Sequence, residues 1–184
     1  ENAGEDVSDY NIVLATRRDN VDYINQHELS KLTTPSVFFD GVIKGEFPET
    51  SLPTLLHLEL KEGAQVIFVK NDMEKKWVNG TLGCIVDIDE EHNILEVVTE
   101  DGVPVKVEPE TWSNTRYTLN EKEHKIEEEE IGTFTQFPLR LAWAITIHKS
   151  QGLTFRNVTV DFSGGTFAGG QAYVALSRCT SLDG

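Results

Sequence analysis

The sequence predicts an α/β fold whose parallel sheet is interrupted by a small antiparallel β-barrel. Residues 11–16 form a short apolar run, and apolar side chains then recur at helical spacing through residues 19–32. A strand followed by a helix in this order begins an α/β unit with a parallel sheet. From residue 60 to residue 136 the pattern changes to short strands with hairpin signals. Strand and helix patterns return after Pro138, so the chain leaves its α/β core and rejoins it.

The first part of the α/β core is predicted at residues 11–59. It opens with a buried strand, and Asp19 is available as the N-cap of the following helix. Residues 33–58 contain scattered Pro and Gly without a clean period, so we expect a long connection with apolar side chains of residues 37–39 tucked beneath it. The polar residues 1–10 are expected to be a disordered N-terminal segment.

The inserted β module is predicted at residues 60–136. Asn79-Gly80 and Asp101-Gly102 are dipeptides typical of hairpin turns. Short antiparallel strands this close together in a chain predict a small barrel. The candidate strands are residues 64–69, 84–88, 94–99, 103–107, 111–118 and 131–137.

The second part of the α/β core is predicted at residues 137–184. We expect a strand at residues 139–142 that joins the sheet begun by residues 11–16, and a short helix at residues 143–151 ended by Gly152. A further strand follows at residues 158–162. A last helix at residues 171–178 is expected to be largely buried because its interior carries no charge.

Charge is distributed unevenly along the chain. The net charge is −15, which alone argues against a nucleic-acid partner. The acidity is concentrated in the middle, notably in the Glu-rich residues 121–130, which we interpret as a solvated loop or exposed strand. Residues 137–184 carry four basic and two acidic side chains. This positive segment is compatible with binding a phosphate backbone.

The segment Thr-Ile-His-Lys-Ser-Gln-Gly, residues 146–152, gathers hydrogen-bond donors at one strand-to-helix turn. At helical pitch Thr146, Lys149 and Ser150 share a face, and these donors together suit phosphate oxygens. The alternative is a capped helix with a few surface polar groups, and for His148 alone we favour such a structural role. For the seven residues together we favour phosphate binding.

Three arginines are further candidates for phosphate contacts. Arg178 follows an apolar helix that would hold it rigidly, so it could act as an arginine finger on a transferring phosphoryl group or interact with the helix macrodipole. Arg17 and Arg18 follow the first strand, at the edge where open α/β sheets place ligands. One of them is a second phosphate sensor, or both are a surface pair on a helical turn.

Several expected features are absent from the sequence. It contains no Gly-x-x-x-x-Gly-Lys-Ser/Thr phosphate loop, no apolar strand that ends in paired acids for magnesium, and no metal-ligand spacing. No apolar run approaches the roughly 18 residues of a membrane span. The chain therefore carries side chains suited to contact phosphates but lacks the loop that binds a nucleoside triphosphate. This combination is what we expect of one half of a two-part motor.

Four segments resemble the motifs of one enzyme family. Residues 142–155 (AWAITIHKSQGLTF) and 171–179 (QAYVALSRC) resemble the fifth and sixth motifs of superfamily 1 DNA helicases. Residues 14–25 (LATRRDNVDYIN) resemble the fourth motif. The sequences of these motifs most resemble those of the RecD-like branch that moves 5′ to 3′, in particular the petite-integration-frequency helicases. Residues 58–88 resemble the segment that enters this family's inserted SH3-like barrel.

This resemblance implies the second of two RecA-like motor domains, interrupted by an SH3-like barrel, in an ATP-dependent 5′-to-3′ DNA helicase. Arg178 matches the arginine that reaches the γ-phosphate, and Arg17 or Arg18 falls at a basic phosphate contact. Gln151 and Gly152 would lie near the nucleotide. The groups expected to face the single strand are Thr146, His148, Lys149 and Ser150, and the Asn79-Gly80 turn would approach DNA through backbone groups.

The resemblance also implies the ligands and partners. ATP and Mg²⁺ would be bound mainly by the first motor domain, with no cofactor held tightly by this segment, which we expect to be inactive alone. The expected partners are single-stranded DNA and the N-terminal RecA-like domain of the same protein, in a monomer without membrane attachment. No targeting segment is visible, so we expect a cytoplasmic, nucleoid-associated location in a bacterium. The alternative is a non-catalytic adaptor derived from a helicase domain.

Overall fold

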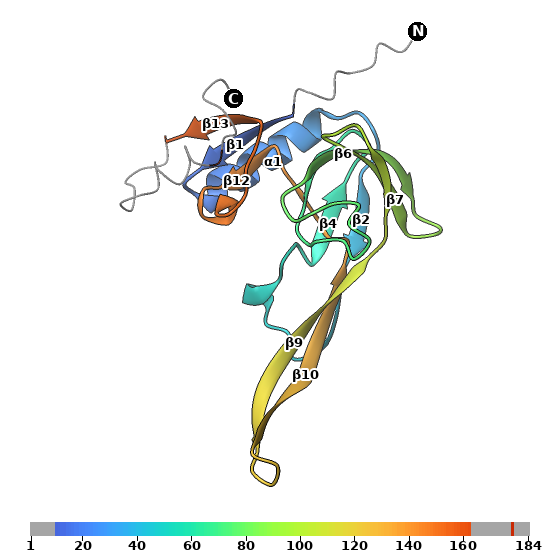
Figure 1. Cartoon of the computed structure of the whole chain (residues 1–184). Coiled ribbons are helices and arrows are strands. Elements are labelled where there is room, and N and C mark those ends of the chain that lie inside the picture. Colours follow the sequence, from blue (N-terminus) through green and yellow to red (C-terminus); the bar gives the residue numbers. More distant parts are fainter. Residues whose placement is uncertain (1–9, 163–177, 179–184) are drawn as a thin grey trace.

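A computed structural model of the chain describes residues 10–162 and residue 178 (Figure 1). Its first sheet has the strand order β12-β1-β13, with β1 at Asn11–Ala15, β12 at Ala144–Thr146 and β13 at Asn157–Asp161. Both neighbours run parallel to the central strand β1. The predicted strands at residues 11–16 and 158–162, and the parallel character of their sheet, are confirmed.

Helix α1 (Arg18–Lys31) packs against this sheet. Val21 buries its side chain against Ala15 of β1 and Ala144 of β12. Asn25 is only 8% exposed, and its amide donates to the carbonyl of Ala144 at 3.1 Å and accepts from the N–H of the same residue at 2.8 Å. A polar side chain is tolerated there because its donor and acceptor are both used by the backbone of β12.

The predicted N-cap of this helix is wrong. Arg17 occupies the cap position and makes no side-chain capping bond. Asp19 lies inside the first turn, where it accepts hydrogen bonds from the guanidinium of Arg17 at 2.9 and 3.2 Å. A carboxylate in the first turn still interacts favourably with the helix dipole.

The predicted strand at residues 139–142 forms but joins a different sheet. Strand β11 (Leu139–Leu141) pairs antiparallel with β5 (Gln65–Phe68) and not with β1. The predicted helix at residues 143–151 is also wrong, because β12 and a single 3₁₀ turn at His148–Ser150 take its place. The N–H of Val13 bonds the carbonyl of Trp143, and the N–H of Ile147 bonds the carbonyl of Ala15. The carbonyl of Trp143 and the N–H of Ile147, which a helix would need for its own hydrogen bonds, therefore bond to β1 instead.

A second sheet is antiparallel and has the order β11-β5-β6-β7-β8. Strands β6 (Leu82–Asp89), β7 (Ile94–Thr99) and β8 (Pro104–Val107) follow β5 along the chain. The turn between β7 and β8 contains Gly102 at φ +78°, which confirms the predicted Asp101-Gly102 hairpin. Within the described residues no pairing of β8 with β11 closes the sheet, so the closed barrel is not confirmed. Because β11 lies beyond residue 136, this sheet also extends past the end predicted for the inserted module.

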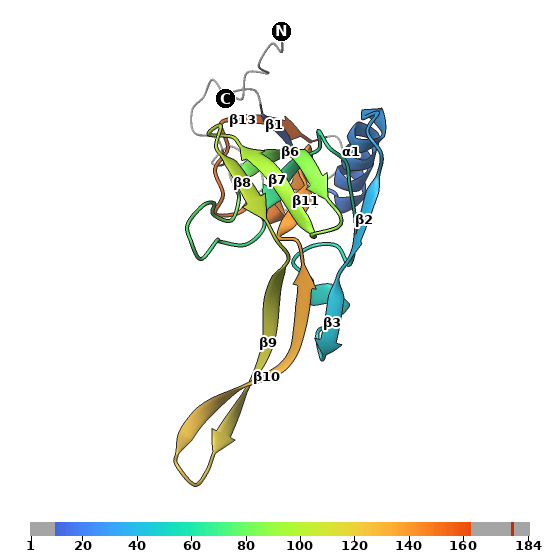
Figure 2. The same ribbon diagram turned by 90° about the vertical axis from the view of Figure 1, so that its right-hand side faces the viewer.

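A long two-stranded hairpin, which we call the arm, projects away from both sheets (Figures 1 and 2). It consists of β9 (Glu110–Asn120) and β10 (Lys125–Gln136). Strand β3 (Val42–Gly45) pairs with β10 at the base of the arm. The Glu-rich residues 121–130 form the turn and the exposed half of β10, as expected for a solvated segment. The strands predicted at residues 111–118 and 131–137 thus belong to the arm and not to a barrel.

The segment predicted as a long connection also contains strands. Strand β2 (Val37–Asp40) pairs antiparallel with β4 (His57–Leu60), and a short 3₁₀ helix spans Glu49–Ser51. Phe38 is 68% exposed, so the prediction that residues 37–39 are tucked under the connection fails for this side chain. Its neighbours in β2 alternate to the other face, as expected for a strand.

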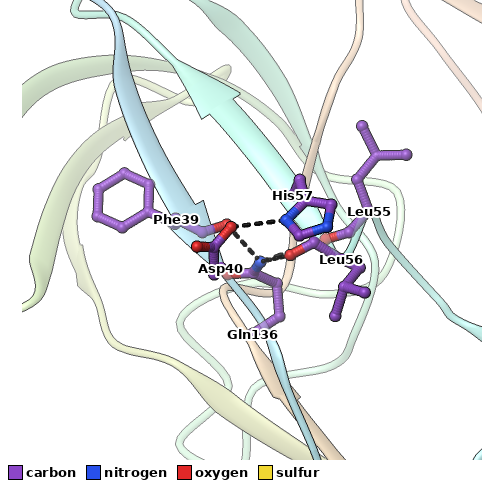
Figure 3. Close-up of polar contacts among 6 residues, drawn as sticks. All are labelled: Phe39, Asp40, Leu55, Leu56, His57 and Gln136. Atoms are coloured by element: carbon purple, nitrogen blue, oxygen red, sulfur yellow. Dashed lines mark hydrogen bonds and ion pairs between the residues drawn. The ribbon is translucent and has the colours of Figure 1, made fainter.

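Gln136 fastens the base of the arm to this pair of strands (Figure 3). Its side chain is 3% exposed, and its amide nitrogen lies 3.0 Å from the carbonyl oxygen of Phe39 and 3.2 Å from those of Leu55 and Leu56. Beside it, Nδ1 of His57 and Oδ1 of Asp40 are 2.7 Å apart at the surface.

In the part of the chain that the structure describes, no helix has the length and apolar character needed to cross a membrane.

Candidate functional site

The carboxyl ends of the parallel strands meet at one edge of the sheet. Ala15, the last residue of β1, lies opposite Thr146 of β12 and Asp161 of β13. The residues that follow β1 and β12 therefore begin side by side, although they are about 130 positions apart in the sequence. Open α/β sheets bind ligands at this edge.

A surface cavity of about 450 Å³ opens at this edge. Its lining combines residues from the loop after β1 with residues from the turn after β12, two groups that the resemblance assigned to the nucleotide and to the single strand, respectively. Its lining includes Thr16, Arg18, Thr146, His148 and Lys149, together with Arg140 from β11. Leu141 and Ile145 add apolar surface between these polar groups, so the cavity combines an apolar wall with a positively charged rim.

Arg18, Arg140 and Lys149 form a cation cluster in this cavity. Burial lowers the pKa of Lys149, and the charges of Arg140 and Arg18 lower it further. Burial is likewise the main cause that lowers the pKa of Arg140, followed by the charge of Arg18, while Asp22 acts in the opposite direction. Among the described residues no carboxylate lies within 4.0 Å of these three cations in an ion pair. Clustered cations without a paired acid favour an anionic ligand.

Arg140 was missed by the sequence reasoning. It lies on β11, a strand of the antiparallel sheet, and the fold brings it to the edge of the parallel one. The only sequence signal was a single charged residue within the apolar run at residues 137–147. A half-buried Arg in such a run is costly unless it has a partner or a ligand.

The two arginines after β1 differ in their surroundings. Arg17 forms an ion pair with Asp19 at 2.9 Å, and its side chain is 59% exposed. Arg18 lines the cavity and influences the pKa values of both Lys149 and Arg140. The geometry therefore favours Arg18 as the one placed for a phosphate contact.

The turn after β12 does not present a single polar face. The side chain of Ser150 is completely buried, and its hydroxyl donates to the carbonyl of Ile147 at 2.6 Å. The hydroxyl of Thr146 accepts from the N–H of Lys149 at 3.3 Å. The predicted common face of Thr146, Lys149 and Ser150 is wrong because a 3₁₀ turn, with three residues per turn, rotates Ser150 into the core.

Arg178 lies directly against the same turn. Its guanidinium donates from Nη1 to the carbonyl of Ser150 at 3.2 Å, and its carbonyl accepts from the N–H of Phe155 at 2.5 Å. The side chain is half-buried and not sealed in the core. Gln151 and Gly152 come directly after Ser150 in the chain, and Gly152 has a φ of +78°. The rest of the predicted helix at residues 171–178 lies outside the described residues.

The Asn79-Gly80 turn lies against the segment after the 3₁₀ turn. The N–H of Asn79 donates to the side chain of Asn71 at 2.7 Å, and the N–H of Gly80 donates to the carbonyl of Phe68 at 2.8 Å. A Cβ atom at Gly80 would lie 2.8 Å from a methyl group of Leu153. The backbone N–H groups of this turn are thus used within the protein, and the DNA contact predicted for Asn79 and Gly80 stays a prediction.

Comparison with known proteins identifies the family. No protein-family model matches the chain. The ATP-dependent DNA helicase Pif1 of Campylobacter jejuni is 36% identical over 94% of the chain. The structure of unliganded Pif1 from Bacteroides superposes with a TM-score of 0.87 and 45% identity over 98% of the chain. The chain belongs to the Pif1 helicase family.

The chain spans about two-fifths of these Pif1 proteins, namely 40% of the Campylobacter protein and 41% of the Bacteroides one. A second structure, Bacteroides Pif1 in complex with ADP-AlF3 and single-stranded DNA, superposes with a TM-score of 0.74 at 46% identity, covering 96% of the chain and 40% of that structure. The resemblance noted from the sequence is therefore confirmed at the level of the Pif1 family.

The contact between Gly80 and Leu153 generates a testable prediction. Gly80→Ala places a methyl group against Leu153 at a residue with φ +98°, and we expect it to lower the free energy of unfolding by about 2 kcal/mol through strain and overpacking. Gly102→Ala is the matched control, because it has a positive φ but open space around the new methyl group. Urea denaturation of both variants measures the difference, and equal losses would contradict the proposed clash.

The lowered pKa of Lys149 predicts how stability depends on pH. The folded state binds this proton less tightly than the unfolded state, so the free energy of unfolding rises with pH between the lowered pKa and the ordinary lysine pKa of 10.5. Lys149→Gln removes this unfavourable charge and should stabilise the chain at pH 7 by about 0.5 kcal/mol, a small value because the side chain is exposed and solvent screens its charge. The difference should shrink toward pH 10.5. Denaturation at both pH values tests this, and a less stable variant at pH 7 would contradict it.

Proposed function

We propose that the chain is the second motor domain of an ATP-dependent 5′-to-3′ DNA helicase, and that it contributes single-strand contacts and an arginine finger. The observation that carries this proposal is the cation cluster of Arg18, Arg140 and Lys149 in the cavity at the carboxyl edge of the parallel sheet. The family relationship supports the reaction class. The sequence has no phosphate loop of its own, so ATP would be bound by a companion motor domain.

The cavity suits the backbone of a single strand. Phosphate oxygens would offset the mutual repulsion of Arg18, Arg140 and Lys149, while Thr146 and His148 supply additional donors on the same rim. The apolar wall lies between these groups and is suited to the face of a base or sugar. Such contacts to the backbone carry no sequence preference, as a translocating motor requires.

The nucleotide side of the proposal rests on Arg178. Its guanidinium bonds the carbonyl of Ser150, one residue after Lys149, so a shift of either group is transmitted through a single turn. When a companion domain closes with ATP, Arg178 would stabilise the charge that develops on the γ-phosphate. The nucleotide contact predicted for Arg17 or Arg18 is not part of this proposal, because Arg18 belongs to the cation cluster and Arg17 is already paired with Asp19.

The polar side chains that line this site are mainly hydrogen-bond donors and cations, and Asp22 is the one carboxylate among them. In the part of the chain that the structure describes, no group of three or more His, Cys, Asp or Glu side chains is placed to hold a metal ion. Mg²⁺ prefers carboxylate and phosphate oxygens. We therefore expect Mg²⁺ to reach the active cleft with ATP on the companion domain, while this chain supplies positive charge from the opposite side.

The salt dependence of DNA binding tests the cavity. Lys149→Gln and Arg140→Gln should each weaken binding of a short oligothymidylate and lower the slope of log affinity against log salt by about 0.7, the value for one phosphate contact on a single strand. Lys106→Gln on β8 is the control, since it makes the same charge change outside the cavity. Fluorescence anisotropy between 50 and 200 mM salt, conditions over which the effect is large, gives the slopes. An unchanged slope in both cavity variants would refute the assignment.

The arginine finger is tested by steady-state hydrolysis. In the complete enzyme Arg178→Ala should lower kcat for ATP by roughly 10³-fold, while ATP affinity changes little because the companion domain binds the nucleotide. Arg17→Ala is the matched control, because Asp19 already neutralises that guanidinium. Unchanged turnover in Arg178→Ala would remove its assigned role. Hydrolysis by the 184-residue chain alone would contradict the division into two motor domains.

A further inference from the structure

The two faces of the arm differ in chemistry. Directly paired residues of β9 and β10 share a face, so the pairs Leu119–Ile126 and Tyr117–Glu128 lie on one side of the hairpin. The intervening pairs lie on the other side, namely Asn120–Lys125, Thr118–Glu127 and Arg116–Glu129. The first group gives a face with three apolar side chains, and the second gives a face that is polar throughout.

Two side-chain contacts join the strands across the polar face. Arg116 and Glu129 form an ion pair at 3.1 Å, and the side-chain amide of Asn120 donates to Glu127 at 2.9 Å. On the apolar face Tyr117 is 71% exposed, Leu119 66% and Ile126 74%. These residues belong to the half of the arm next to its turn, and no described core cluster includes them. The arm as a whole projects from the rest of the molecule (Figure 2). Apolar side chains grouped on one exposed face of a hairpin mark an interaction surface.

The negative charge around the apolar face of the arm favours a cationic partner. Glu128 lies on the same face as Tyr117, and residues 121–130 contain six Glu against two Lys. Such a field repels the phosphates of nucleic acid and attracts cationic groups. Within the described residues, the outer edge of β9 and the far half of β10 pair with no further strand, so their backbone groups are available for strand addition.

We propose that Tyr117, Leu119, Ile126 and Glu128 form a docking face for an extended segment of another protein that alternates apolar and basic side chains. Its apolar side chains would cover Tyr117, Leu119 and Ile126, while its lysines or arginines would pair with Glu128 and neighbouring carboxylates. The arm would thus recruit a protein partner at a position away from the cation cluster, and this role is independent of DNA binding and of ATP hydrolysis.

A peptide titration tests this proposal. The probe is a labelled ten-residue peptide of alternating lysine and valine, titrated against the full chain by fluorescence anisotropy. The double variant Leu119→Thr with Ile126→Thr keeps strand propensity and should weaken binding at least tenfold. The matched control is Asn120→Thr with Lys125→Thr, the adjacent pair on the polar face, which should bind as tightly as the unmodified chain or more tightly. A glutamate–valine peptide should not bind.

Four results would overturn the proposal. The first is no binding of the lysine–valine peptide to the unmodified chain at 1 mM, and the second is equal binding to both double variants. The third is a loss of oligothymidylate affinity in the Leu119/Ile126 variant, which would make the face a DNA surface. The fourth is dissociation of a dimer in that variant, seen by sedimentation, which would make it an interface between copies of this chain. Unchanged circular dichroism of the variants shows that folding is retained.

Discussion

The parallel pairing of β1 with β12 is the constraint on which the site depends. It joins residues about 130 positions apart, and its register sets Ala15 opposite Thr146. Everything that follows either strand therefore starts at the same edge. Asn25 reinforces the register because its amide bonds both backbone groups of Ala144. A slip of one residue would lose these bonds and would turn the side chains of β12 to the opposite face of the sheet.

The cations of the cavity are held at a cost to the folded state. Arg140 is half-buried, Lys149 lies near it and near Arg18, and the lowered pKa values of Arg140 and Lys149 reflect this unfavourable environment. Stability alone would favour neutral side chains or a carboxylate among them. A site that must bind and release a phosphate backbone repeatedly needs the opposite arrangement, because a permanent acidic partner would compete with the ligand. This is the usual exchange of stability for function at a binding site.

The sequence allowed local features to be predicted, and non-local pairing was where prediction failed. The strand before Thr16 and the Asp101-Gly102 hairpin follow from neighbouring residues and are found in the structure. The helix expected at residues 143–151 fails because β1 captures the backbone around Ala144, a partner that no local pattern reveals. Arg140 was missed for the same reason, since its place in the cavity depends on strands from both sheets. The closed barrel was predicted from strand spacing, but β9 pairs with β10 and β10 pairs with β3. Among the described strands, β11 is the one from beyond residue 136 that extends the antiparallel sheet of β5 to β8.

The strong net acidity of the chain and its proposed binding of phosphates are compatible because the charges are segregated. Interactions between exposed charges are largely screened beyond about 10 Å at ordinary ionic strength. The Glu-rich residues 121–130 lie on the arm, which extends away from the parallel sheet (Figure 1), whereas Asp22 is the one acidic side chain among the residues described as lining the cavity. The potential that a phosphate ligand would meet at the cavity is thus set by Arg18, Arg140 and Lys149 and not by the total of −15. The same segregation leaves the arm unsuited to DNA, so one domain can present a phosphate-binding surface and a surface for basic partners at the same time.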